Sequence, residues 1–345
     1  MSLSPLPKED LEAVFCQVGK DWEKLRGKSV FLTGGSGFFG SWLLESLLFS
    51  EDRLGLGVKV WALSRDPKRF RDRLPHLAGH IAVQLVGGGV EGFAFPRGKM
   101  NFVIHSMVPD SEMPLLKMEA WFSAGTARLL ELAVRDKSEG FLLCSTGAVY
   151  QPQKRPLSEE DPLIPLAAPL SYGRIRRQVE EQCLELCKSH GIPLKIARGF
   201  AVAGPRLPLD ANFAFGNFIR DAIQGEPIKV KNGAPFRSYL YSADLTIWLW
   251  KILLQGRAFI PYNVGSDTKI TISMLAQRIA TVTRLANNSG VPETREPLSG
   301  SDTASAVYVP QTQRITSEMN LAKTTSLDES IKKTLHYALS AKQPN

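Results

Sequence analysis

Three glycines between a predicted strand and a predicted helix constrain the fold more than any other feature of this chain. A compact apolar run, Ser-Val-Phe-Leu-Thr, is followed by Gly34, Gly37, Phe38, Phe39 and Gly40, and helical spacing begins directly after them. The tight turn and the close approach of a pyrophosphate both need backbone without side chains. The helix N-terminus then offers free N–H groups and a positive dipole to phosphates. The segment is predicted to bind a dinucleotide.

The pattern that follows alternates between short apolar strands and amphipathic helices. Predicted strands cover 29–33, 58–64, 81–86, 102–105 and 141–145, and helical patterns cover 43–49, about 68–74 and 121–135. Strands that alternate with helices indicate a parallel, doubly wound α/β sheet with both faces covered.

Three regions are expected from this rhythm. Residues 1–27 form a helical extension, 28–200 the dinucleotide-binding sheet domain, and 201–345 mainly a smaller substrate-binding lobe with weaker periodicity. In the extension, apolar residues recur at helical spacing over 5–26. The predicted elements of the lobe are helices at 218–224, 245–254 and 327–339, and strands at 228–230 and 237–241.

Composition narrows the class of protein. The 345 residues are 43% hydrophobic and 22% charged, as in ordinary globular proteins, and no apolar run approaches the roughly 18 residues of a membrane span. Four cysteines suit a reducing, cytoplasmic setting. Cys183 and Cys187 lack a second ligand pair and are predicted to face the core, so no metal site is expected.

The charge balance favours anionic partners. With 42 basic and 34 acidic residues, the chain carries a formal charge of +8. No nucleic-acid motif accompanies its basic residues, so neither nucleic acid nor a membrane is expected as a partner.

The end of the second predicted strand bears on the choice of cofactor. An acidic residue there would select a free ribose 2′-hydroxyl, whereas a basic one accepts a 2′-phosphate. The strand ends in Ser64 and Arg65, with Lys68 and Arg69 close by, which favours NADP over NAD. The alternative is a solvated charge run. His105 ends the fourth strand, where it either contacts the cofactor or is satisfied by backbone.

A second group of polar residues lies at the end of the fifth strand and the start of a later helix. Ser145 and Thr146 end the strand, and Tyr172 opens a helix that carries Arg176 four residues on, on the same face. A cation beside a phenol stabilises the phenolate, and a nearby hydroxyl holds a substrate oxygen against it. The alternative is a surface Tyr–Arg pair on an amphipathic helix.

Together with the glycine loop, these residues resemble the extended short-chain dehydrogenase/reductase family, specifically its nucleotide-sugar epimerases and dehydratases such as dTDP-glucose 4,6-dehydratase. Further matching segments are 198–206, 225–228, 237–244, 262–265 and 327–331.

The resemblance implies a Rossmann-type fold, NAD(P) as cofactor, a nucleotide-diphosphate sugar as substrate and a homodimer formed through helices near 117–136 and 172–188. It implies that Tyr172 is the acid/base, with Thr146 or Ser145 as its hydroxyl partner. Arg237 would bind the substrate diphosphate, with Asn212 a second candidate.

The chain departs from the family at several of these positions. Arg176 stands where the family has lysine, Phe122 replaces a frequent asparagine, and Gly89 replaces an aspartate that contacts adenine. Gly147 and Ala148 replace the Asp-Glu pair that dehydratases use. Epimerisation or ketone reduction is therefore favoured over 4,6-dehydration, and a non-catalytic member that binds cofactor or sugar nucleotide is the alternative of a different class.

Overall fold

The computed structural model describes residues 2–110, 112–211, 213–287, 294–295 and 307–340. The chain divides into two compact units, each built from separate stretches. The first unit contains Met1–Tyr150, Pro162–Gly199 and Thr246–Tyr262, and the second contains Gln151–Asp161, Phe200–Leu245 and Asn263–Asn345.

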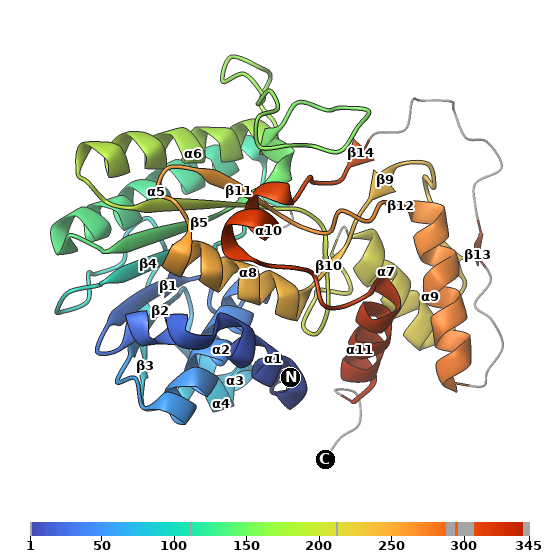
Figure 1. The fold of residues 1–345 in the computed structure, drawn as a ribbon, viewed down its shortest axis with the longest axis horizontal. Coiled ribbons are helices and arrows are strands. Elements are labelled where there is room, and N and C mark those ends of the chain that lie inside the picture. The colour runs from blue at the N-terminus through green and yellow to red at the C-terminus, as the bar shows by residue number, and fades with distance from the viewer. Residues whose placement is uncertain (1, 111, 212, 288–293, 296–306, 341–345) are drawn as a thin grey trace. The chain divides into compact units, whose positions relative to one another are not determined.

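The centre of the first unit is a seven-stranded sheet, counted over the described residues (Figure 1). The strands are β1 (Ser29–Thr33), β2 (Lys59–Ser64), β3 (Val83–Gly87), β4 (Phe102–His105), β5 (Gly140–Thr146), β6 (Leu194–Gly199) and β11 (Pro261–Val264), in the spatial order β11-β6-β5-β4-β1-β2-β3. All pairings among β1–β6 are parallel. The chain reverses its direction of winding between β1 and β4, and ligands of such sheets bind at the carboxyl ends of the strands at that point.

Helices surround this sheet. They are α1 (Lys8–Val18), the 3₁₀ helix η1 (Gly19–Leu25), α2 (Phe38–Leu54), α3 (Pro67–Arg73), α4 (Pro75–Ala78), α5 (Leu115–Asp136), the 3₁₀ helix η2 (Gly147–Val149), α6 (Tyr172–Ser189) and α8 (Ser242–Gln255). The predicted extension helix therefore forms, but it changes from α to 3₁₀ geometry at Gly19. No described helix is long and apolar enough to cross a membrane.

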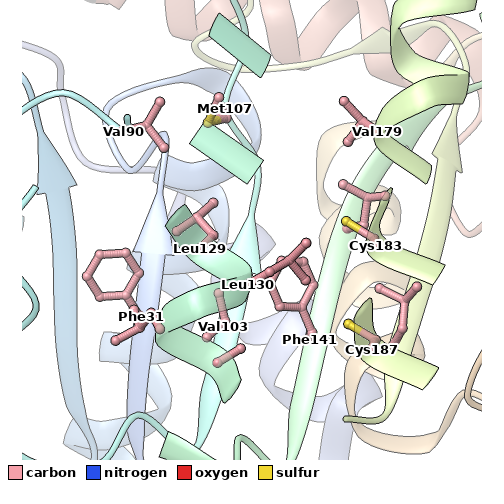
Figure 2. Packing of buried hydrophobic residues seen from close by; sticks show 14 of the residues in the cluster. Phe31, Val90, Val103, Met107, Leu129, Leu130, Phe141, Val179, Cys183 and Cys187 are labelled. Carbon is pink, nitrogen blue, oxygen red and sulfur yellow. The ribbon is translucent and has the colours of Figure 1, made fainter. Parts of the chain in front are cut away.

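One face of the sheet is sealed by α5 and α6, which lie side by side (Figure 1). Alternate strand residues such as Phe31, Val103 and Phe141 point into a core completed by Leu129 of α5 and Cys183 of α6 (Figure 2). All five side chains are buried because alternate residues of a strand face the same side of the sheet.

Cys183, Cys187 and Trp250 occupy core positions. Cys183 and Cys187 are both fully buried, which confirms the prediction that they face the core. Trp250 is also fully buried, and its indole Nε1 donates to Ser46 Oγ of α2 at 2.9 Å.

The second unit is built from short strands and helices. Its elements are β7 (Val202–Ala203), α7 (Ala214–Gln224), β8 (Ile228–Lys229), β9 (Phe236–Arg237), β10 (Leu240–Tyr241), β12 (Ile270–Thr271), α9 (Ile272–Asn287), β13 (Thr294–Arg295), β14 (Val307–Tyr308), α10 (Gln313–Met319) and α11 (Leu327–Ser340). The strands form small sheets, of which β12-β9-β14 has three strands in the described residues.

Every strand predicted for the sheet domain is confirmed to within two residues at each end. Strand β6 was not predicted, although it is central to the site, and neither were β11 and α9. Domain boundaries at 27 and 200 stay predictions.

Candidate active site

The glycine loop is shaped by backbone approaches that leave no room for side chains. Gly34 follows β1 with a φ of 70°, and a Cβ there would stand 2.5 Å from the carbonyl oxygen of Ser106. A Cβ on Gly40 would stand 2.1 Å from the Gly34 carbonyl oxygen, to which the Gly37 N–H donates at 2.8 Å. The glycines therefore bring the end of β1, the start of α2 and the end of β4 together.

The N-terminus of α2 has free donors. Its N-cap is Gly37, and no side chain caps the helix. Its first backbone N–H groups therefore remain available to an anion. Phe38 and Phe39, the first two residues of the helix, are half-buried, with ring centroids 5.9 Å apart.

At the end of β2, Arg65 is engaged by a partner that the sequence did not reveal. Its Nη1 and Nη2 donate to Asp110 Oδ2 and Oδ1 at 3.1 and 3.2 Å. The hydrogen bonds from Arg65 hold the pKa of Asp110 below its ordinary value. The neighbouring Ser64 accepts a hydrogen bond from the Asp66 N–H at 3.3 Å, and Asp66 caps α3 by accepting from the Arg69 N–H at 2.9 Å.

A carboxylate also lies beside Gly89, the position at which the family that this chain resembles carries an aspartate. A Cβ on Gly89 would stand 2.9 Å from an oxygen of Glu91. Glu91 therefore brings negative charge to the end of β3 although residue 89 itself has no side chain.

His105 is completely buried at the end of β4. Its Nε2 and the Thr126 Oγ1 of α5 lie 3.0 Å apart, while its Nδ1 has no hydrogen-bond partner. Burial, together with the nearby Arg176 charge, lowers the pKa of His105 to about 3, so the ring is neutral at pH 7. Contact of His105 with a cofactor stays a prediction.

The start of α6 is packed against the end of β5. Ser171 caps α6 by accepting from the Arg174 N–H at 3.2 Å, and Tyr172 is the first helical residue, 37% exposed. A Cβ on Gly173 would stand 2.1 Å from the Ala148 carbonyl oxygen, so the helix meets the segment after β5 backbone to backbone. In that segment Thr146 Oγ1 accepts from the Ala148 N–H at 3.2 Å. Tyr172 and Thr146 are thus brought to the same edge of the sheet.

Arg176 lies one turn further along α6, beneath this edge. It is 2% exposed, its Nη2 donates to the Cys144 carbonyl oxygen at 2.6 Å, and its guanidinium lies 4.5 Å from the Phe122 ring centroid. Its Nε and Nη1 have no hydrogen-bond partner. A flat guanidinium packs well on an aromatic ring, whereas the asparagine frequent at position 122 in the family offers no ring. The two departures from the family pattern, Phe122 and Arg176, are therefore in direct contact and structurally coupled.

A further turn along α6, Glu180 organises a buried polar cluster, which we call the Glu180 network. Ser145 Oγ donates to Glu180 Oε1 at 2.5 Å, and Arg198 of β6 donates to both Glu180 oxygens, at 3.1 and 2.8 Å. Arg198 Nη1 also donates to Tyr150 Oη at 2.9 Å. All four residues are buried. Burial alone would lower the pKa of Arg198, but the Glu180 charge and hydrogen bonds raise it above its ordinary value.

Sequence reasoning missed Glu180 and Asp110. Glu180 continues the four-residue spacing of Tyr172 and Arg176 on one helix face, and that periodicity would have found it. Asp110 lies in a loop, and no sequence signal connects it with Arg65, 45 residues away.

Arg237, the residue predicted to bind the substrate diphosphate, lies in the second unit. Arg237 of β9 is half-buried, its Nη1 donates to the Phe236 carbonyl oxygen at 2.9 Å, and its guanidinium lies 5.4 Å from the Tyr308 ring centroid. Asn212 lies outside the described residues.

Comparison with known proteins identifies a family that matches most of the chain. Residues 30–265 match the NAD dependent epimerase/dehydratase family. A protein of Arabidopsis thaliana, UDP-glucuronic acid decarboxylase 6, is 29% identical over 259 residues, which cover 72% of this chain and 73% of that protein.

Solved structures share the fold. The epimerase Mth375 of Methanothermobacter thermautotrophicus superposes with a TM-score of 0.77 at 17% identity, covering 94% of this chain and 96% of that one. The UDP-glucuronic acid 4-epimerase of Bacillus cereus, solved with NAD, gives 0.72 at 19% identity, covering 91% of this chain and 100% of that one.

Proposed function

The chain belongs to the NAD dependent epimerase/dehydratase family, and from that premise we propose an NAD(P)-dependent enzyme that epimerises or oxidoreduces a nucleotide-linked sugar by hydride transfer. The observation that carries this proposal is the common sheet edge. An uncapped helix N-terminus, held by the sterically required glycines Gly34 and Gly40, lies at the same edge as Tyr172 and Thr146.

The first unit fits a dinucleotide. A Cβ at Gly34 or Gly40 would fill the loop, and the free N–H groups of α2 suit a pyrophosphate. The unpartnered Nε and Nη1 of Arg176 are buried donors that the hydroxyls of the nicotinamide ribose would satisfy. Arg65 is the residue that we assign to a 2′-phosphate, which favours NADP.

Each reacting group at the edge has a distinct role in the proposed reaction. The dinucleotide, when bound, supplies a hydride acceptor and donor at its nicotinamide ring. Tyr172 accepts the proton of the sugar hydroxyl as the carbon is oxidised and returns it on reduction. Thr146 Oγ1 holds the same sugar oxygen. Ser145 supports the strand end from below, because its hydroxyl proton is donated to Glu180.

The substrate is inferred from the relatives. The curated relative is named for UDP-glucuronic acid, and the Bacillus cereus structure is named for the same sugar nucleotide. We assign Arg237 to the diphosphate, because a guanidinium fork donates to two oxygens at once. Dehydration is disfavoured, because Gly147 and Ala148 supply no acid or base beside Thr146.

We also assign a homodimer to α5 and α6. Leu115 and Leu116, at the start of α5, are 40% and 75% exposed, which suits an apolar surface covered by a second copy. A monomer mass by light scattering would contradict this assignment.

The test is turnover by the purified chain. The protein, freed of bound dinucleotide, is incubated with NAD or NADP and UDP-, dTDP-, GDP- or CDP-sugars, with UDP-glucuronic acid among them, and products are followed by mass and stereochemistry. Replacing Tyr172 by Phe should lower turnover by about 10²–10⁴-fold, because general acid/base catalysis contributes that much. The affinity for NADH should stay within about twofold, because the phenol is not needed to hold the pyrophosphate.

Turnover that survives Tyr172→Phe would contradict the catalytic role. Tight binding of a sugar nucleotide without turnover by the unaltered chain would establish the non-catalytic alternative instead.

A further inference from the structure

The ion pair between Arg65 and Asp110 joins the two segments that flank the glycine loop. Arg65 directly follows β2, and Asp110 lies five residues after the end of β4. Because β1 lies between β4 and β2 in the sheet, the pair connects strand ends that are about 10 Å apart, on either side of the loop that follows β1.

This location is where a bound dinucleotide must lie. A pyrophosphate on the α2 N-terminus directs the adenosine ribose toward the end of β2, where residue 65 stands. A residue that contacts the 2′-position must therefore present its side chain at this place. Arg65 presents a guanidinium there, but the Asp110 carboxylate already occupies both of its terminal nitrogens.

The contact has the geometry that a phosphate would use. Two parallel N–H···O bonds of 3.1 and 3.2 Å form a fork-to-fork pair, and an arginine binds phosphate oxygens in the same way. Asp110 therefore competes with a 2′-phosphate for the same donors. Glu91 adds a second negative charge that acts on Arg65, while Arg69 and Lys117 act on Asp110.

The pair is also weak enough to be displaced. The side chains of Arg65 and Asp110 are 64% and 65% exposed, and exposed ion pairs contribute little to stability. A ligand can therefore open the pair without disturbing the fold.

We infer that Asp110 is a specificity-determining residue that limits the NADP preference conferred by Arg65, by acting as an internal substitute for the 2′-phosphate. This inference rests on the proposed dinucleotide site and concerns which of two dinucleotides that site prefers. NAD leaves the pair closed, whereas NADP must break it and place its phosphate beside the displaced carboxylate.

The experiment measures binding rather than activity. The full chain, freed of dinucleotide, is titrated with NADH and with NADPH while nicotinamide fluorescence is followed. Asp110→Asn should tighten NADPH by about two- to fivefold, the range of an exposed ion pair, and change NADH by less than about twofold. The gain should shrink in high salt, because exposed charges are screened.

Two further variants make the test specific. In an Arg65→Ala background, Asp110→Asn should no longer change the ratio of the two affinities. Asp72→Asn removes the same charge from α3, and Asp72 is not among the charged groups that act on Arg65 or Asp110. This variant should leave the ratio of the two affinities as it is in the unaltered chain.

Equal effects of Asp110→Asn on NADH and NADPH, no effect on either, or an effect that persists without Arg65 would each overturn the inference while leaving the dinucleotide site intact. Failure of the unaltered chain to bind either dinucleotide would overturn the proposed function as well.

Discussion

At the scale of single residues, the Glu180 network is a buried ion pair with additional hydrogen bonds in the first unit. Glu180 is completely buried and would be a large cost without its partners. Arg198 donates to both of its oxygens and Ser145 donates to one. Because β5 and β6 pair Ser145 with Arg198, the network ties two strand ends and α6 together just below Thr146.

Removing Glu180 should destabilise the fold strongly. Glu180→Ala leaves Arg198 as an unpaired buried charge, and breaking a buried ion pair costs about 3–5 kcal/mol. Urea unfolding followed by circular dichroism measures this loss in the free energy of unfolding.

The neighbouring Glu181 provides the control. It is 39% exposed and pairs with Arg177 at the surface, so Glu181→Ala should cost no more than about 1 kcal/mol. Equal losses for the two variants would show that the Glu180 network contributes no more than a surface pair.

At the scale of elements, the junctions of β1 with α2 and of β5 with α6 determine the site. Each is a place where backbone approaches backbone, at Gly40 over Gly34 and at Gly173 over Ala148. Such contacts hold a helix N-terminus at a strand end without side chains in between. The free N–H groups of α2 and the Tyr172 phenol are thereby presented at one edge.

A methyl group at the first junction should damage both the fold and the site. In Gly40→Ala the new Cβ would stand 2.1 Å from the Gly34 carbonyl oxygen, and neither backbone can yield without shifting α2. We expect a loss of stability of about 1–3 kcal/mol, typical of overpacking, and at least about a tenfold weaker affinity for NADH.

Thermal unfolding and fluorescence titration measure the two effects. Gly92→Ala is the matched substitution, because a Cβ at Gly92 meets nothing within 4 Å. A Gly40→Ala variant that binds NADH as tightly as Gly92→Ala would rule out the required close approach at α2.

At the scale of the whole molecule, stretches of the two compact units alternate along the chain. The first unit includes Thr246–Tyr262, which follows the stretch Phe200–Leu245 of the second unit along the chain. This segment is integral to the first unit. Lys251 Nζ lies 2.7 Å from Asp21 Oδ2, and the Trp250 ring meets Trp22 edge-on at 5.2 Å.

A chain that ends at residue 200 should therefore fail to fold cooperatively. It retains the glycine loop and Tyr172 but loses residues 246–262. Trp22 then lacks its contact with Trp250, and Asp21 lacks its ion pair with Lys251. Deleting one buried aromatic side chain alone costs about 3–5 kcal/mol, a large part of typical domain stability. Circular dichroism on heating should show no single sharp transition. A cooperative transition in the fragment would show that 1–200 is an independent domain.

Local patterns were sufficient for strands β1–β5, the glycine loop and the start of α6, because the spacing of apolar residues and glycines acts over a few residues. They did not reveal β6 or β11. The amino-acid sequence by itself thus determined the fold class, and it predicts the edge of the sheet at which we propose the site. The partners Asp110 and Glu180, and the return of 246–262 to the first unit, were decided only by the tertiary structure. Those contacts join residues 35–230 positions apart, and chain folding brings together charges and rings that no local spacing relates.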